Sequence, residues 1–463
     1  MLTLVDSHGK WGRREFLRIG GLALGGLTLP QLLASQAAAT ERLGVTEKSV
    51  IFLFLHGGPS QFETFDPKMT APAGVRSVTG EIPTKLPGVT FGTTLPRLAA
   101  LADRFAVVRS FTTGNGNHDI KPIVCPQTFN ANIGAHYARI VGANHPVSGL
   151  PTNVALFPRA IDPDRKPPNF SFGDFRATGT LGAGYAPFVP GAGGEFQKNL
   201  ELTMPRERLD DRRRLLTALD RIRRELDTSG ELEGIDRFRM QAFETLLGGA
   251  AKAFDLSKED PRTVARYDTA PLVRPEQISR RWNNYNNYVD NAMTVGKLLL
   301  LARRLCEAGC GFVTVTTNFV WDMHADANNA GVEEGMEYMG PPLDYAVSAF
   351  IEDVESRGLS DKIMLVVAGE MGRTPKVNKN GGRDHWGELA PLMIYGGGIR
   401  RGQVIGQSTA DGGAPLSEPY TIDNLLATIM HTLLDVGAVR LMRGLPDEVL
   451  RVATGSQPIA GLL

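Results

Sequence analysis

Short apolar segments without polar alternation constrain this chain most, because a strand of this kind must be buried on both of its faces. The clearest is VIFLFL at 50–55, which ends abruptly at His56 and a Gly-Gly-Pro turn. Strands buried on both faces are typical of parallel sheets that are covered by helices. Similar segments predict further strands at 105–108, 311–317, 363–369 and 390–397.

Helical periodicity separates these predicted strands. Helices are expected over 291–309, with Gly309 as a stop, over 343–358 and over 421–436. Strands that alternate with helices in this order predict an α/β fold, with a mostly parallel central sheet flanked by helices.

Two regions do not follow this alternation. Residues 142–194 are rich in Pro and Gly without a clear period, which indicates irregular structure. Residues 205–254 are helical in pattern and charged, and their interleaved acids favour a solvated helical face over a polyanion-binding surface. We therefore expect a single domain over 40–463 with a helical insertion at about 195–290.

The first 39 residues have the features of an export signal. A pair of arginines at 13–14 is followed by Phe-Leu at 16–17, a glycine-rich apolar stretch and three alanines at 37–39. A transmembrane helix needs about 20 strongly apolar residues, which this stretch lacks. These features predict a twin-arginine signal peptide at 1–39 and a mature protein that is periplasmic or otherwise extracytoplasmic. The alternative is a basic amphipathic helix within the domain.

Charge and cysteine content exclude some classes of function. The chain has 50 basic and 50 acidic residues, so its net charge gives no reason to expect nucleic acid or an anionic membrane as a partner. Three cysteines are too few for a disulfide framework, and Cys306 and Cys310 are expected in the core. His136 is expected at the surface. No Walker loop, G-x-S-x-G, H-E-x-x-H or C-x-x-C motif occurs.

Histidines and acids follow the predicted strands. In an open α/β sheet, ligands bind beyond the carboxyl ends of the strands, so residues in the loops after each strand are the candidates. These candidates are His56, His118, Asp322, His324, Glu370, Asp384 and His385. Imidazole and carboxylate together suit zinc, manganese or iron better than calcium. The sequence thus predicts a site for one or two divalent metal ions, zinc or manganese first.

A metal at this edge could polarise a phosphoryl or sulfuryl oxygen and lower the pKa of a bound water. Arg373 and Arg383 could hold an oxyanion with forked hydrogen bonds, and so could the backbone amides of the HGGPS turn. Structural interpretations of single residues stay open. Asp322 could be a turn residue, Glu370 an ion-pair partner of Arg373, and His56 a neutral histidine bonded within its own loop.

Several longer motifs follow one another along the chain: FLHGGPSQFETFDPK, LLARRLCEAGCGFVTV, WDMHAD, GEMGRTPKVN, GRDHW and GGGIRRGQVIGQS. Together with the signal peptide they resemble the bacterial domain-of-unknown-function family 1501, over nearly the whole mature chain. That family is placed in the alkaline phosphatase/sulfatase superfamily. The resemblance implies an alkaline-phosphatase-like sandwich with a metal site at the carboxyl edge of its sheet.

The resemblance also implies roles for individual residues. Asp322 and His324 resemble the acid–imidazole pair for one metal, although the superfamily usually spaces that pair more widely. His385 resembles the final ligand histidine. Glu370 falls where the superfamily has an Asp-His or Asp-Asn pair after a strand.

The sequence departs from the superfamily pattern at two places. His56 stands where the superfamily has its first-strand aspartate, and Glu63 or Asp66 could supply that carboxylate instead. The superfamily nucleophile is a Ser, Thr or Cys at a helix start, where this chain has His118, so we assign catalytic roles to His118 and Arg373. No C-x-P-S-R motif exists, which disfavours a formylglycine sulfatase. Hydroxyl and thiol groups nearby belong to Ser110, Thr112, Thr113 and Cys125.

One functional hypothesis and one rival follow. The hypothesis is an exported metal-dependent hydrolase that acts on a small-molecule or polymer-borne phosphate or sulfate ester, with metal-bound hydroxide as a candidate attacking group. Its expected metal ligands are Asp322, His324, Glu370, His385, Asp384 and His56. The rival is a degenerate, non-catalytic extracytoplasmic binding or scaffold protein with the same fold.

Overall fold

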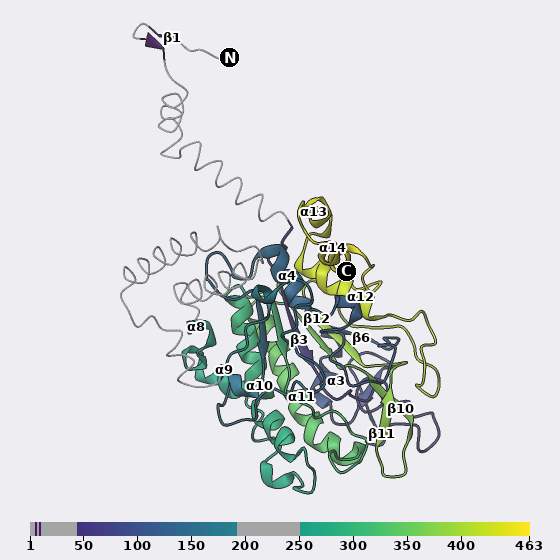
Figure 1. Cartoon of the computed structure of the whole chain (residues 1–463). Coiled ribbons are helices and arrows are strands. Elements are labelled where there is room, and N and C mark those ends of the chain that lie inside the picture. Colours follow the sequence, from purple (N-terminus) through teal and green to yellow (C-terminus); the bar gives the residue numbers. More distant parts are fainter. Residues whose placement is uncertain (1–4, 7–8, 11–43, 192–250) are drawn as a thin grey trace.

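The structure is a computed structural model of the whole chain that describes residues 5–6, 9–10, 44–191 and 251–463 (Figure 1). The predicted signal peptide at 1–39 lies almost entirely outside the described residues, as does most of the charged segment 205–254. The domain boundaries and the extent of the helical insertion therefore stay predictions. Among the described residues, no helix has the length and apolar character needed to cross a membrane.

A seven-stranded sheet lies at the centre of the molecule. Its strands are β3 (Ser49–Phe54), β6 (Phe105–Val108), β7 (Asn153–Leu156), β8 (Phe312–Val315), β9 (Ile363–Ala368), β12 (Leu392–Gly396) and β13 (Gln403–Ile405). Their order across the sheet is β13-β6-β12-β9-β3-β8-β7. β12 is antiparallel to both of its neighbours and every other adjacent pair is parallel, so the predicted α/β fold with a mostly parallel sheet is confirmed.

Helices cover both faces of this sheet (Figure 1). They are α3 (Pro96–Ala100), α4 (Ile133–Val141), α8 (Ala251–Phe254), α9 (Pro261–Arg266), α10 (Tyr285–Glu307), α11 (Val332–Ser356), α12 (Ile422–Leu433), α13 (Val436–Leu441) and α14 (Asp447–Thr454). Short two-stranded sheets are formed by β1 (Val5–Asp6) with β2 (Gly9–Lys10), β4 (Glu81–Pro83) with β5 (Thr90–Gly92), and β10 (Gly372–Val377) with β11 (Arg383–Trp386).

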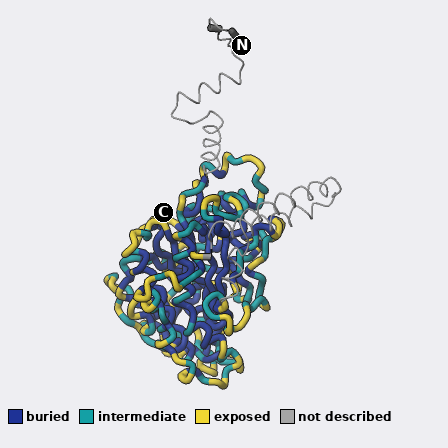
Figure 2. Tube along the Cα trace, turned by 90° about the vertical axis from the view of Figure 1, so that its left-hand side faces the viewer, coloured by how far each residue is buried: buried dark blue, intermediate teal, exposed yellow. Residues whose placement is uncertain are grey.

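The burial of β3 explains its unbroken apolar sequence. Successive side chains of a strand point to opposite faces of the sheet. Ile51 and Leu53 pack in one apolar cluster with residues of α10 and α11. Phe52 and Phe54 pack in a second cluster with residues of α4 and α12. Both sets are buried in the interior that Figure 2 shows, so neither face of the strand tolerates a polar side chain.

Two strand predictions are wrong. The region 142–194, expected to be irregular, contains β7, which pairs with β8 at the end of the sheet. Four residues are too few to show a period against Pro- and Gly-rich flanks. The loop expected after the strand at 363–369 is instead the β10–β11 hairpin, in which Arg373 pairs with His385. The strands could not be predicted from this sequence, because it is charged and contains a proline.

The helix predicted over 343–358 begins earlier than expected. α11 starts at Val332 and contains Pro341 and Pro342 in its interior. Proline normally ends a helix, which is why the sequence favoured a later start. Met336 and Met339 of the first turns are fully buried in the core, and this packing holds the segment helical through the prolines. α10 ends at Glu307, just before Gly309 with its φ of 104°, so the predicted stop is confirmed.

His136, Cys306 and Cys310 are all buried. Cys306 and Cys310 are buried, as expected. The surface prediction for His136 is wrong, because this residue is fully buried. Its Nε2 lies 2.8 Å from the carbonyl oxygen of Thr128, which satisfies one ring nitrogen inside the protein.

A buried ionic network fixes residues around α9 to the long helices. Glu259, with a side chain 8% exposed, lies 2.7 Å from Arg303, 2.9 Å from Arg304 and 3.1 Å from Arg357. Arg303 also lies 3.1 Å from Asp353. One carboxylate therefore joins the segment before α9 to both α10 and α11.

Candidate metal centre

The loops at one edge of the sheet bring the candidate residues together. β3, β6, β8 and β9 run in the same direction, so their carboxyl ends lie at the same edge. His56 follows β3, His118 follows β6, Asp322 follows β8 and Glu370 follows β9. The β10–β11 hairpin adds His385.

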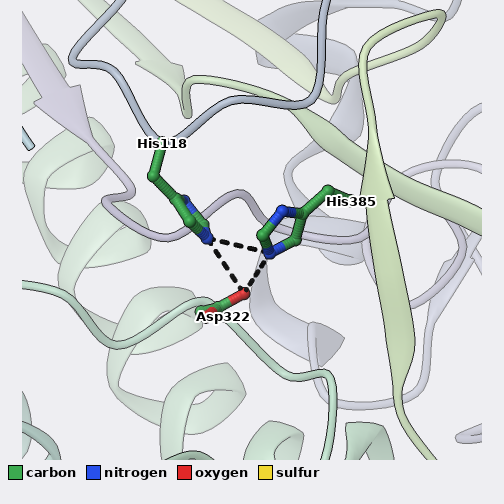
Figure 3. A group of neighbouring side chains, drawn as sticks. All are labelled: His118, Asp322 and His385. Carbon is green, nitrogen blue, oxygen red and sulfur yellow. Dashed lines mark hydrogen bonds and ion pairs between the residues drawn. The ribbon is translucent and has the colours of Figure 1, made fainter.

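Three side chains converge at this edge: His118, Asp322 and His385 (Figure 3). His118 Nε2 lies 2.9 Å from His385 Nε2 and 3.4 Å from Asp322 Oδ1, and His385 Nε2 lies 3.2 Å from the same oxygen. Donor atoms bound tetrahedrally to zinc at about 2.0–2.1 Å are about 3.3 Å apart. Both the spacing and the chemistry of two imidazoles and one carboxylate therefore fit one divalent ion.

The three residues differ in exposure. The side chain of Asp322 is 4% exposed and that of His118 is 12% exposed. His385 is the most open, with 37% of its side chain exposed. An ion held by these atoms would therefore face solvent on the His385 side, where positions for water or a substrate remain open.

Glu370 contacts His118 and the backbone of Gly57. His118 Nδ1 lies 3.0 Å from Glu370 Oε1, and the backbone N–H of Gly57 donates to the same oxygen at 2.8 Å. A carboxylate in this position fixes the imidazole tautomer with the proton on Nδ1, which leaves Nε2 as the ligand atom. Burial alone would lower the pKa of His118, but its hydrogen bonds to Asp322 and Glu370 raise it.

Asp322 is the centre of the electrostatic network. Arg373 Nη2 donates to Asp322 Oδ1 at 2.6 Å, and Asn329 donates to Oδ2 at 3.2 Å. Burial alone would raise the pKa of Asp322, but the charge of Arg373 and the hydrogen bonds from the surrounding histidines hold it far below its usual range. The carboxylate is therefore ionised and available as a metal ligand across the physiological pH range.

His324 contacts the carboxylate of Asp322, whereas Asp384 does not. His324 Nε2 lies 2.8 Å from Asp322 Oδ2, on the other oxygen of that carboxylate, and 3.9 Å from Asp326 Oδ2. Its hydrogen bond to Asp322 raises the pKa of His324. Asp384 is exposed and accepts a hydrogen bond from Asn378 at 3.0 Å. Neighbouring residues of a strand point to opposite faces, so Asp384 is directed away from the face that His385 uses.

His56 is enclosed by phenylalanine rings. It is 1% exposed, and both of its ring nitrogens lack a hydrogen-bond partner among the described residues. Its ring contacts Phe54, Phe172, Phe175 and Phe319 at centroid distances of 5.5, 5.7, 5.9 and 5.1 Å. Burial lowers the pKa of His56 to about 4. His56 is therefore a neutral residue that is not among the three converging side chains, and its role as a metal ligand stays a prediction.

The two carboxylates considered as substitutes for a first-strand aspartate are engaged elsewhere. Glu63 is fully buried and forms an ion pair with Arg383 at 3.1 Å. Asp66 lies 3.3 Å from Lys68 and 3.4 Å from Arg109. Neither is among the residues that converge with Asp322. The pairing of Arg383 with Glu63 also removes Arg383 from the candidate oxyanion donors.

Arg373 is buried and its guanidinium is already bonded. It donates to the carbonyl oxygen of Gly58 at 2.7 Å, to that of Arg383 at 3.3 Å, to that of Gly57, and to Asp322. Two amides of the HGGPS turn are occupied too, since Gly57 N–H donates to Glu370 and Gly58 N–H donates to the carbonyl oxygen of Leu55. The arrangement makes Arg373 a support for Asp322, and its predicted oxyanion role would require some of these bonds to break.

The nearby hydroxyl and thiol groups are buried or bonded within the fold. Thr112 donates its hydroxyl to the carbonyl of Gly387 at 3.0 Å. Ser110 is fully buried and Thr113 is 6% exposed. Burial raises the pKa of the Cys125 thiol, which disfavours the nucleophilic thiolate.

Comparison with known proteins identifies the family. The family model described as a protein of unknown function, DUF1501, matches residues 47–463. The chain belongs to the DUF1501 family. The family resemblance seen in the sequence motifs is thereby confirmed. No curated protein has a sequence that matches this DUF1501 protein significantly.

Solved structures similar to the DUF1501 protein include the sulfatase PsFucS1 from Pseudoalteromonas sp., with 10% identity and a TM-score of 0.35 over 99% of this chain and 78% of that one. The lipoteichoic acid synthase LtaP from Listeria monocytogenes has 8% identity and a TM-score of 0.31 over 92% and 80%. The phosphonate monoester hydrolase SpPMH from Silicibacter pomeroyi has 12% identity and a TM-score of 0.31 over 83% and 73%. Similarities this low do not identify the substrate of the DUF1501 protein.

Two contributions to the site of the DUF1501 protein were missed from the sequence. Asn329 bonds Asp322, and only its position seven residues after that acid in the same loop could have suggested it. The second is the contact of His118 with Glu370, two candidates that the sequence did not pair, and the catalytic role assigned to His118 stays a prediction. The spacing of His118 from Glu370, 252 residues along the chain, gave no signal for their pairing.

Proposed function

We propose that this DUF1501 protein is an exported, metal-dependent hydrolase of the alkaline phosphatase/sulfatase type that acts on a phosphate or sulfate ester. The observation that supports this most directly is the convergence of His118 Nε2, Asp322 Oδ1 and His385 Nε2. Atoms of this kind at this spacing suit zinc or manganese.

The residues in and around the cluster would have different roles. His118, Asp322 and His385 would hold the ion. Glu370 would keep His118 in the tautomer that presents Nε2, and Arg373 would hold Asp322 ionised and in place. A divalent ion bound there would polarise the ester oxygen and lower the pKa of a bound water.

A second ion is compatible with the same carboxylate. Asp322 Oδ2 faces His324 Nε2 at 2.8 Å, and Asp326 lies 3.9 Å from that nitrogen. His324, together with Oδ2 of Asp322, would hold such an ion, which would supply further stabilisation of negative charge on the ester.

The sequence supports an extracytoplasmic location and an ester as partner. The arginine pair at 13–14 and the alanines at 37–39 support export by the twin-arginine pathway. Equal numbers of basic and acidic residues, 50 of each, give no support to a nucleic-acid partner. Replacing the arginine pair by lysines and comparing cell fractions tests export, because a chain that still leaves the cytoplasm does not use this signal.

Metal content and ester turnover test the proposed function together. Elemental analysis of purified protein is expected to give near-stoichiometric zinc, manganese or iron that is lost in Asp322→Ala and His385→Ala. Asp384→Ala is the matched control, since Asp384 lies on the same hairpin but is exposed and bonded to Asn378. The metal-loaded protein is then assayed with p-nitrophenyl phosphate and p-nitrophenyl sulfate. Well-folded protein that takes up none of these metals would contradict the proposal.

The non-catalytic alternative is supported by a specific observation. Each guanidinium nitrogen of Arg373 donates to a protein oxygen, and the hydroxyl and thiol groups nearest in sequence to His118 are buried or bonded. A binding or scaffold protein with a metal would have these features. Protein that binds metal stoichiometrically and hydrolyses neither class of ester, nor phosphonate esters, would favour this alternative.

A further inference from the structure

A buried lysine lies beside the candidate metal centre. Lys121 is 2% exposed, and its Nζ donates to Asp119 Oδ1 at 2.7 Å, to Asn115 Oδ1 at 2.9 Å and to the carbonyl oxygen of Asn117 at 2.9 Å. Removing an ammonium from water is costly unless its charge and its N–H groups are satisfied. Here all three N–H groups have an acceptor, so the lysine is fully committed to these contacts.

All three acceptors belong to the segment that carries His118. We call residues 112–121 the His118 loop. Asn115, Asn117 and Asp119 lie three residues before, one before and one after His118. The ammonium therefore fixes the backbone on both sides of this histidine from within the loop.

The His118 loop is also attached to the segment that carries His385. The backbone N–H groups of Thr113 and Gly114 donate to the carbonyl oxygen of Gly387 at 3.1 and 3.0 Å. At Gly116, even a Cβ atom would lie 3.0 Å from Cβ of His385. The loop backbone thus packs directly against the residue that supplies the second imidazole, and a shift of the loop would change the distance between the two imidazoles.

We propose that Lys121 is a positioning residue that preorganises His118 as a metal ligand. The inference rests on the proposed function, because it assumes that His118 and His385 bind a metal ion. Lys121 acts only through the His118 loop. Its three N–H groups are occupied and buried, so it contacts neither the ion nor a substrate.

Zinc affinity of the full chain tests this role without any assay of activity. Lys121→Met keeps the length of the side chain and removes its charge and donors. It is expected to weaken zinc binding about 10- to 100-fold, as other losses of ligand support do. Lys85→Met is the matched control, because Lys85 forms a similarly short ion pair, 2.8 Å to Asp103, with a side chain that is 54% exposed. The control is expected to bind zinc as the wild type does.

A double-mutant cycle separates positioning from a general structural effect. If Lys121 acts through His118, then Lys121→Met causes no further loss of zinc affinity in a His118→Ala background. An equal loss in both backgrounds would overturn the inference, and so would wild-type affinity in folded Lys121→Met. If Lys121→Met does not fold, Asp119→Ala replaces it. This variant removes one acceptor of the Lys121 ammonium, and the Asp119 side chain is 47% exposed. Its loss of zinc affinity is expected to be several-fold smaller than the loss expected for Lys121→Met. Wild-type affinity in Asp119→Ala would then overturn the inference.

These outcomes also separate the inference from the proposed function. A wild-type chain that binds zinc, together with a Lys121→Met variant that binds it equally well, overturns the inference alone. A folded wild-type chain with no zinc, manganese or iron affinity overturns the metal-dependent function and the inference together.

Discussion

His118 Nδ1 lies 3.0 Å from Oε1 of Glu370, a carboxylate that is fully buried and also accepts the backbone N–H of Gly57. This contact fixes which nitrogen of His118 carries a proton and which faces Asp322 and His385. The residue after β9 therefore places a buried carboxylate against one of the candidate ligands, and a ligand role of Glu370 itself stays a prediction.

Glu370→Gln is expected to lower metal affinity about 10-fold, because the amide keeps an acceptor near Nδ1 but loses the charge that makes the imidazole a better ligand. Asp322→Ala removes a ligand and is expected to abolish stoichiometric binding. Competition with a chromogenic chelator measures both. If Glu370→Gln loses the metal as completely as Asp322→Ala does, Glu370 binds the ion directly.

Metal affinity is expected to fall as the pH falls. Burial alone would lower the pKa of His118, but hydrogen bonds to Asp322 and Glu370 raise it above 6.5, and the bond to Asp322 raises the pKa of His324. A metal needs neutral imidazole nitrogens, so protons compete with it from above pH 6.5 downward. The dissociation constant is measured between pH 8 and pH 5.5.

The same titration has an internal control. Glu370→Gln removes one of the contacts that raise the pKa of His118, so the loss of affinity should begin at a lower pH in this variant. A dissociation constant that does not change over the whole range would mean that the imidazoles do not bind the ion.

Five of the seven strands in the central sheet, β3, β6, β8, β9 and β12, were predictable because they are buried on both faces, which forces a continuous apolar run such as that of β3. β7 and β13 were missed, since both are short and β13 is only half-buried. The hairpin was not, because β10 and β11 lie outside the central sheet and carry charged residues and Pro375. α11 was misplaced for a related reason. Local propensity at Pro341 favours a break, and only the packing of the turns before it keeps the helix continuous.

The edge of the sheet at which the site lies was also predictable, because the direction of parallel strands places their following loops together. The role of each side chain was not. Asp384 and His385 are neighbours in sequence, yet the strand directs them to opposite faces. In the sequence, Arg373 is a basic residue in a predicted loop, but its guanidinium is buried and donates to the carbonyl oxygens of Gly57 and Gly58. Such contacts depend on the tertiary fold, which composition and spacing do not report.

His56 is expected to make the protein sensitive to acid. Burial lowers the pKa of His56 from 6.5 to about 4, so between these values the unfolded chain binds a proton that the folded chain does not. Stability should therefore fall as the pH falls from 6.5 to about 4, by about 3 kcal/mol for a shift of this size. His56→Phe removes the titrating group and keeps an aromatic ring among phenylalanines.

Urea unfolding of the metal-free protein at pH 7 and pH 4 measures this effect. The comparison is the loss of unfolding free energy between the two pH values, which cancels any cost of the substitution that does not depend on pH. The wild type should lose about 2–3 kcal/mol more than His56→Phe. Equal losses would mean that His56 takes up its proton in the folded state.

The ionic network around Glu259 should contribute to stability without affecting the metal centre. Glu259→Gln removes this carboxylate from Arg303, Arg304 and Arg357. Arg303 and Arg357 keep Asp353 as a partner, so a loss of about 1–2 kcal/mol is expected in the free energy of unfolding. Metal affinity should stay at the wild-type value. Asp174→Asn is the control, because the Asp174–Arg176 pair is about half exposed, and its loss should change stability by about 0.5 kcal/mol or less.

The acid dependence of this difference provides a second check. Burial alone would raise the pKa of Glu259, but its hydrogen bonds to Arg304 and Arg303 lower it from 4.5 to about 2. A carboxylate with a depressed pKa stabilises the fold above its unfolded value, and this contribution is lost as the pH falls toward the folded value. The stability gap between wild type and Glu259→Gln should therefore narrow between pH 4.5 and pH 2. A gap that stays constant in that range would place its origin in packing and not in the charge of Glu259.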